Sequence, residues 1–199
     1  MGQAPVIDGT IQSDEWEDAV QVPLVGGEAV FLKISGRHLF VAVRGSSGGI
    51  GSLGLSTPDS LRILHASTGL ITASFAREEN RWRLVHGFSG PKTQTGEPFG
   101  RGEERSTDVY RSTSLEQYGW TANIVDAGPP TDLEYQIQLN GLPRSRTRLA
   151  VVFFQVRAEV RMAHAPATLA DDSLDRELIS GTATDGLHFD TTGWLMLRW

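Results

Sequence analysis

The stretch Leu133-Glu134-Tyr135-Gln136-Ile137-Gln138-Leu139 decides the fold class, because apolar and polar residues alternate along its whole length. Successive side chains of a β-strand point to opposite faces of a sheet, so this pattern predicts a strand with one buried side. A sheet with one face in water is typical of antiparallel β proteins. The stretch therefore predicts an antiparallel all-β fold rather than a parallel sheet covered by helices.

Strand-like stretches continue on both sides of this segment. The run from Leu149 to Val156 is apolar in both phases, as expected of a central strand that is covered on both faces. We expect the other strands at Val30 to Ile34, Leu39 to Arg44, Ser60 to His65, Leu70 to Arg77, Arg81 to His86, Trp120 to Val125 and Gly193 to Trp199.

Helical periodicity is confined to Ser13 to Ala19, with Ser13 as the N-cap, and to Ala167 to Leu178. Many short strands and one or two short helices predict a two-sheet antiparallel β-sandwich of jelly-roll type. We expect one domain over residues 1 to 199. Its core should include Leu39, Val41, Ile137, Leu139, Val151 and Phe153.

Two segments lack strand periodicity and are predicted to be loops, Gly45 to Pro58 and Gly87 to Gly119. A loop as long as the second is either functional or disordered. The first contains a G-x-S-x-G match and a G-x-G-x-x-G match, but no helix follows either one. Because a nucleophile elbow and a dinucleotide loop both require that helix, we expect a plain loop there.

Composition excludes several classes of function. The formal net charge is −6, from 24 acidic and 18 basic residues without a basic stripe, so we expect no nucleic-acid partner. No apolar run approaches the roughly 18 to 20 residues that a membrane span needs. The chain has no cysteine, which removes disulfides, thiolate nucleophiles and cysteine metal sites. No signal peptide is visible at the start of the chain.

Candidate metal ligands are sparse. The five histidines never occur at H-x-x-x-H spacing, so we expect no zinc site. Asp171, Asp172 and Asp175 form the densest acidic cluster, and oxygen-rich clusters of this kind can hold calcium. Acidic residues at the start of a helix explain the same cluster equally well. Nothing in the sequence marks out a pair of catalytic carboxylates.

The opening Pro5-Val6-Ile7-Asp8-Gly9-Thr10-Ile11, followed by Asp14-Glu15-Trp16 and Ala19, resembles the opening of family 9 carbohydrate-binding modules and their DOMON-like relatives. The resemblance implies a β-sandwich with Trp16 in its core. Later strands also resemble the family, but Arg62 stands where the family has a glutamate, and Gln138 stands where it has a proline.

That resemblance implies a secreted or periplasmic protein without catalytic activity, and its leading functional interpretation is carbohydrate binding. Sugars stack on aromatic rings, so we expect Trp120 to be the stacking platform, at the end where the two predicted loops meet. Trp82, Tyr118 and Arg62 complete the candidate site, with core packing as the alternative for Trp82, which shares a strand face with Leu84.

Two alternatives stay open. DOMON-like relatives include haem-binding redox domains that use a methionine and a lysine, for which this chain offers Met162, Met196, Lys33 and Lys92. A core methionine is the simpler explanation of either methionine. The other alternative is a structural domain that packs on other protein modules and has no sugar site.

Overall fold

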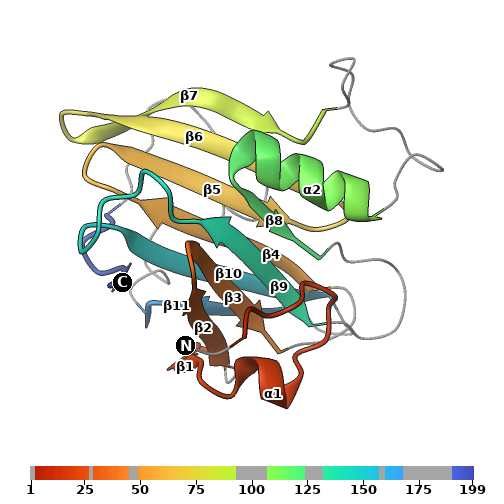
Figure 1. Cartoon of the computed structure of the whole chain (residues 1–199). Helices are drawn as coiled ribbons and strands as arrows, with labels where there is room; N and C mark the ends of the chain where they lie inside the picture. Colours follow the sequence, from red (N-terminus) through yellow and green to blue (C-terminus); the bar gives the residue numbers. More distant parts are fainter. Residues whose placement is uncertain are drawn as a thin grey trace.

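The part of the chain that the structure describes folds into two antiparallel sheets of five and seven strands, with two short helices (Figure 1). The computed structural model describes residues 3–26, 29–44, 49–92, 107–123, 132–156, 160–167 and 190–199. This architecture confirms the predicted all-β sandwich. Within these residues, no helix is long and apolar enough to cross a membrane.

The smaller sheet has the strand order β1-β2-β3-β9-β8 and is called the small sheet below. Every neighbouring pair in it is antiparallel. Its strands are β1 (Val20–Pro23), β2 (Ala29–Ser35), β3 (His38–Val43), β9 (Leu133–Gln138) and β8 (Trp120–Ala122).

The larger sheet has the order β11-β10-β4-β5-β6-β7, with β12 paired to β10, and is called the large sheet below. Its pairs are also antiparallel. Its strands are β4 (Gly49–Ser56), β5 (Ser60–Ala66), β6 (Leu70–Glu78), β7 (Arg81–Ser89), β10 (Arg148–Val156), β11 (Val160–Ala165) and β12 (Leu195–Met196).

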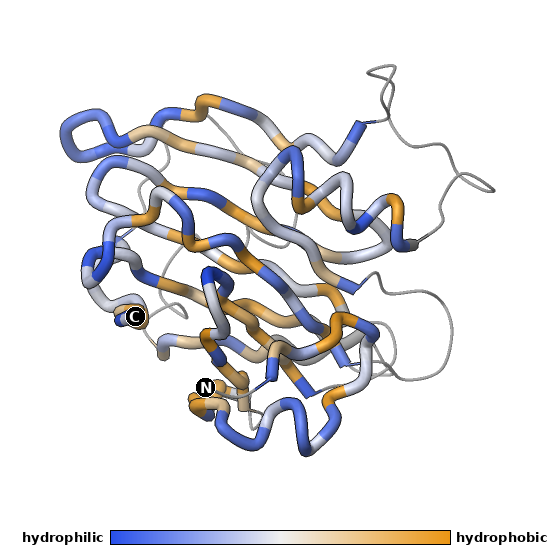
Figure 2. The backbone as a smooth tube through the Cα atoms, viewed as in Figure 1, coloured by the Kyte–Doolittle hydropathy of each residue, from blue (hydrophilic) through white to orange (hydrophobic). Residues whose placement is uncertain are grey.

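The main core lies between the two sheets, where apolar side chains of both meet. Figure 2 shows the apolar residues gathered in the strands, while the turn between β6 and β7 is hydrophilic. A second cluster, here called the outer cluster, covers the face of the large sheet that points away from the small sheet. The residues predicted from the sequence to form the core are all buried: Trp16, Leu39, Val41, Ile137, Leu139, Val151 and Phe153.

The predicted loop from Gly45 to Pro58 is wrong over most of its length, because Gly49–Ser56 forms β4 between β10 and β5. Its glycines leave room for large neighbours. A Cβ atom at Gly51 would lie 2.3 Å from Leu133 Cδ2, and one at Gly54 would lie 2.5 Å from the Trp194 ring. Glycine is therefore required here by close packing on both faces of a central strand.

The predicted loop from Gly87 to Gly119 is also wrong at its C-terminal end, where Thr107–Tyr118 forms helix α2. Its buried stripe runs through Tyr110 and Ser114, one turn apart, to the half-buried Tyr118. Because Ser114 in this stripe is polar, the apolar residues alone do not show the helical period. Figure 1 shows α2 beside β8, in front of the large sheet.

Smaller differences concern the ends of the elements. Helix α1 is only Ser13–Trp16, and Ser13 lies inside it because Gln12 occupies the N-cap position. Strands β1 and β11 were not predicted, and the last strand is shorter than predicted. The predicted helix from Ala167 to Leu178 lies outside the described residues beyond its first position.

Candidate functional site

Trp120 does not present an exposed ring. Its side chain is 0% exposed, its Nε1 donates a hydrogen bond to Thr72 Oγ1 at 2.7 Å, and its ring stacks on Tyr135 with centroids 6.0 Å apart. The expectation of a stacking platform at Trp120 is wrong for this structure, because both faces of the ring pack inside the core. The predicted strand from Trp120 to Val125 is observed as Trp120–Ala122, and all three of its residues are buried, so the strand has no exposed side on which a ring could be displayed.

Trp82 is buried as well. It belongs to the outer cluster with Phe75, and the Arg77 guanidinium lies over its ring at 5.6 Å from the centroid. The Arg77 side chain, which comes from β6, therefore covers one face of the Trp82 ring. Neither predicted tryptophan can therefore stack on a sugar in this conformation.

The other two predicted residues, Arg62 and Tyr118, do come together. They line a pocket of about 490 Å³ formed by β5, β6, β7 and the C-terminal end of α2, here called the α2 pocket. The remaining lining residues are Thr72, Ser74, His86, Ser89 and Gln117. All seven lining residues are polar.

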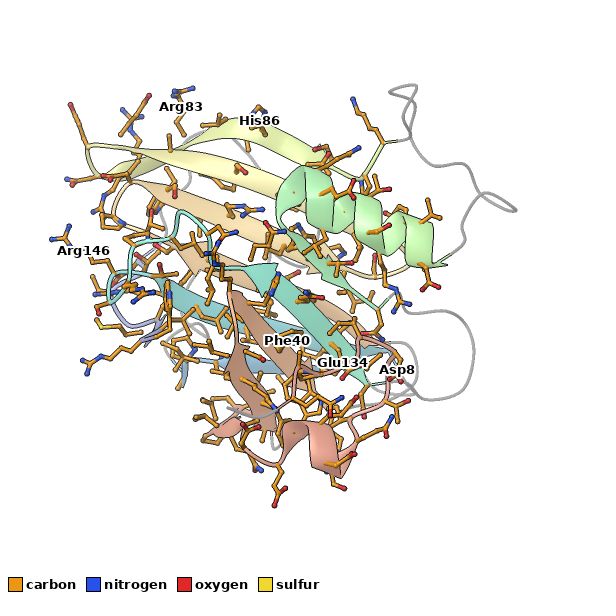
Figure 3. All side chains as sticks on the ribbon, viewed as in Figure 1. Asp8, Phe40, Arg83, His86, Glu134 and Arg146 are labelled. Carbon is orange, nitrogen blue, oxygen red and sulfur yellow. The ribbon has the colours of Figure 1, made fainter. Side chains whose placement is uncertain are left out.

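Strand register explains why these side chains meet. Arg62 pairs with Ser74 on β6, and Ser74 pairs with His86 on β7. Thr72 pairs with Ser89 one step further along. Cross-strand partners share a face of the sheet, so the register builds a polar row across three strands. Figure 3 shows His86 on β7, at the edge of the large sheet.

Arg62 is the charged group of the α2 pocket. Its Nη2 donates a hydrogen bond to the carbonyl oxygen of Tyr118, the last residue of α2, where the negative end of the helix dipole lies. Burial lowers the pKa of Arg62 from its ordinary value, but a guanidinium stays charged at neutral pH. Among the described residues, no carboxylate forms an ion pair with it.

The rim of the α2 pocket is held by hydrogen bonds to the chain that follows β7. Tyr118 Oη donates to the Gly90 carbonyl at 2.8 Å. The Gln117 amide donates to the Lys92 carbonyl at 2.8 Å and accepts from the Lys92 amide at 3.0 Å. Trp120 supports the floor through its bond to Thr72. These hydrogen bonds join the α2 side of the pocket to the chain that follows β7, and Trp120 to β6.

A second ionisable group, Glu134 on β9, lies in an environment of a different kind. Its side chain accepts hydrogen bonds from the amides of Asp8 at 3.1 Å and Gly9 at 2.8 Å, and from Trp16 Nε1 at 3.2 Å. Figure 3 shows Glu134 close to Asp8, where the N-terminal segment crosses the small sheet. Burial, partly offset by these bonds, raises the pKa of Glu134 to about 7. We call this arrangement the Glu134 clamp.

The remaining predicted ligands do not form a site that the structure describes. Asp171, Asp172 and Asp175 lie outside the described residues. Within the described part of the chain, no group of three or more histidine, aspartate or glutamate side chains could hold a metal ion. Lys33 is a candidate haem ligand. Its Nζ instead forms an ion pair with Asp18 Oδ1 at 2.5 Å and donates a hydrogen bond to the Glu15 carbonyl at 2.6 Å. Met196 is 46% exposed on β12. The Met162 side chain lies outside the described part of the chain.

No family model, curated protein or solved structure matches this chain. The resemblance of residues 5 to 19 to carbohydrate-binding modules therefore stays a prediction.

Proposed function

We propose that the protein is a non-catalytic carbohydrate-binding domain whose site is the α2 pocket. One observation carries this proposal: a pocket of about 490 Å³, lined only by polar side chains, contains the desolvated guanidinium of Arg62. Ligand pockets of small molecules commonly have volumes of about 300 to 1,000 Å³, so one or two sugar units would fit.

The chemistry of the lining favours an acidic sugar. The hydroxyl groups of Thr72, Ser74 and Ser89 can each donate and accept, as hydrogen bonding to sugar hydroxyls requires. Arg62 can only donate, and its planar fork matches a carboxylate. A uronic acid would place its carboxylate on Arg62 and its hydroxyls on the polar row.

The absence of catalysis is part of the same proposal. Glycoside hydrolysis generally uses a pair of carboxyl groups on either side of the scissile bond. The described lining of the α2 pocket contains no aspartate or glutamate. A site of this composition is suited to holding an acidic sugar without cleaving it.

Calorimetric titration with oligosaccharides of glucuronic acid and of glucose tests the proposal. We expect only the acidic series to bind, and Arg62→Ala to weaken binding by about thirtyfold, the usual cost of losing a central charged contact. Arg81→Ala is the matched control, because Arg81 is exposed on β7 and does not line the pocket. Equal binding of both series, or unchanged binding by Arg62→Ala, would refute the proposal.

A further inference from the structure

A second pocket, of about 380 Å³, lies where β4, β6 and β10 meet the segment that leads into β12. Arg77, Arg146 and Arg148 all contribute to its lining, so we call it the triple-arginine pocket. Figure 3 shows Arg146 on the side of the molecule away from α2. No residue lines both this pocket and the α2 pocket.

Strand phase separates the two pockets further. On β6, Arg77 has the phase of Phe75, which belongs to the outer cluster, whereas Thr72 and Ser74 have the opposite phase. Arg148 pairs with Ser56 at the adjoining ends of β10 and β4. The triple-arginine pocket is thus built on the face of the large sheet that points away from the small sheet.

Two of the three guanidinium groups are held in place by neutral contacts. Arg148 Nη1 donates to the Thr191 carbonyl at 2.7 Å. Arg77 lies over the Trp82 ring, and its Nε donates to the Glu79 carbonyl at 3.4 Å. These contacts orient the side chains and bring no negative charge to them. Preorganised arginines lose less conformational entropy when a ligand binds.

Acidic groups do not neutralise this pocket within the described residues. None of the three arginines forms an ion pair there, and no aspartate or glutamate is part of the lining. Exposed Asp190, outside the lining, does interact with it: its carboxylate accepts bonds from the Thr192 amide at 2.9 Å and hydroxyl at 2.5 Å, and these bonds and the charge of Arg148 lower its pKa. Three positive charges are therefore concentrated in one pocket of a chain whose net charge is −6.

We propose that the triple-arginine pocket binds a phosphate or sulfate monoester. A tetrahedral oxyanion offers several acceptor oxygens to converging guanidinium forks, and charge-assisted bonds of this type are the strong ones. The hydroxyl groups of Ser145 and Thr191 in the lining can supply the neutral donors that such an anion also uses. The pocket is large enough for the anion and part of the group that carries it.

The test is titration of the full chain with inorganic phosphate and sulfate at constant ionic strength, followed by heteronuclear NMR. Constant ionic strength keeps general screening from imitating a site. We expect saturable binding with shifts at the pocket, and about a tenfold loss of affinity for Arg146→Ala and for Arg77→Ala. Arg62→Ala should leave the affinity unchanged, which makes this result independent of the proposed sugar site.

Arg144→Ala is the matched control, because Arg144 is exposed two residues from Arg146 and does not line the pocket. Equal weakening by Arg144→Ala and Arg146→Ala, or absence of saturation, would overturn the proposal. Glucose 6-phosphate and glucose 6-sulfate then distinguish the source of the anion, and the tighter ester identifies it. Binding of the inorganic ions without either ester would also overturn the proposal of a monoester site.

Discussion

The Glu134 clamp and the α2 pocket each hold a desolvated ionisable side chain, yet they differ in how that side chain is satisfied. Glu134 accepts three N–H bonds from the N-terminal segment and Trp16, and its side chain is 0% exposed. Arg62 donates one hydrogen bond to a backbone carbonyl and lines an open pocket. The carboxylate oxygens of Glu134 are therefore bonded within the protein, whereas Arg62 keeps N–H donors for a ligand.

This difference separates structural burial of charge from functional burial. A shifted pKa alone marks both groups, because desolvation is the largest cause of each shift. Access and unused hydrogen-bonding capacity mark only Arg62. The following predictions test whether the two regions really play these different parts.

Removing the ring at the centre of the clamp should have the largest effect. Trp16 is 3% exposed, contacts Phe31 edge-on with centroids 6.3 Å apart, and donates to Glu134. We expect Trp16→Ala to lower the free energy of unfolding by roughly 3 to 5 kcal/mol, the usual cost of deleting a buried large aromatic. Urea unfolding measures this. A loss below about 1 kcal/mol would show that the N-terminal segment is poorly packed on the small sheet.

The clamp should also make stability depend on pH. The pKa of Glu134 is raised from the ordinary 4.5 to about 7, so the folded protein holds this proton more tightly than the unfolded chain. The contribution is therefore fully present below about pH 4.5 and is lost as the pH rises through about 7. Its size is on the order of 3 kcal/mol for a shift of this extent.

Urea unfolding of the wild-type protein and of Glu134→Gln at several pH values between 4 and 8 isolates this contribution. Other titrating groups are common to both chains and cancel in the difference. We expect the stability of the wild type relative to the variant to fall as the pH rises. A difference that stays constant would mean that the pKa of Glu134 is the same in the folded and unfolded chains, and a difference that rises with pH would mean that the three N–H donors keep Glu134 ionised.

The sequence predicts the parts of this fold where side chains alternate clearly. Leu133–Gln138 and the neighbouring strands follow from period-2 patterns, and the core residues follow from their apolar phase. Strand β4 could not be found in this way, because Gly51 and Gly54 are set by the Leu133 and Trp194 side chains that pack against them. Such contacts join residues far apart in the chain and leave no local pattern.

The sequence predicted only two of the seven residues that line the candidate site. Arg62 and Tyr118 were among the predicted residues, but Thr72, Ser74, His86, Ser89 and Gln117 were not. The signal that could have found two of them is the polar phase of β6, where Thr72 and Ser74 alternate with apolar neighbours. Pairing Ser74 with Arg62 requires the strand register, which the sequence does not show. Likewise, an aromatic pattern cannot tell a displayed tryptophan from the buried Trp120.

The smallest expected effect is the loss of Arg62 from the folded protein in the absence of ligand. Its bond to the Tyr118 carbonyl caps the end of α2, but water in the pocket can replace that donor. We therefore expect Arg62→Met, which retains much of the aliphatic stem, to lower the free energy of unfolding by only about 1 kcal/mol. Urea unfolding, with amide exchange in α2 as a local readout, measures this cost. A loss of 3 kcal/mol or more would place Arg62 with Glu134 as a structural charge. The α2 pocket would then lose the free donor on which acidic-sugar binding depends.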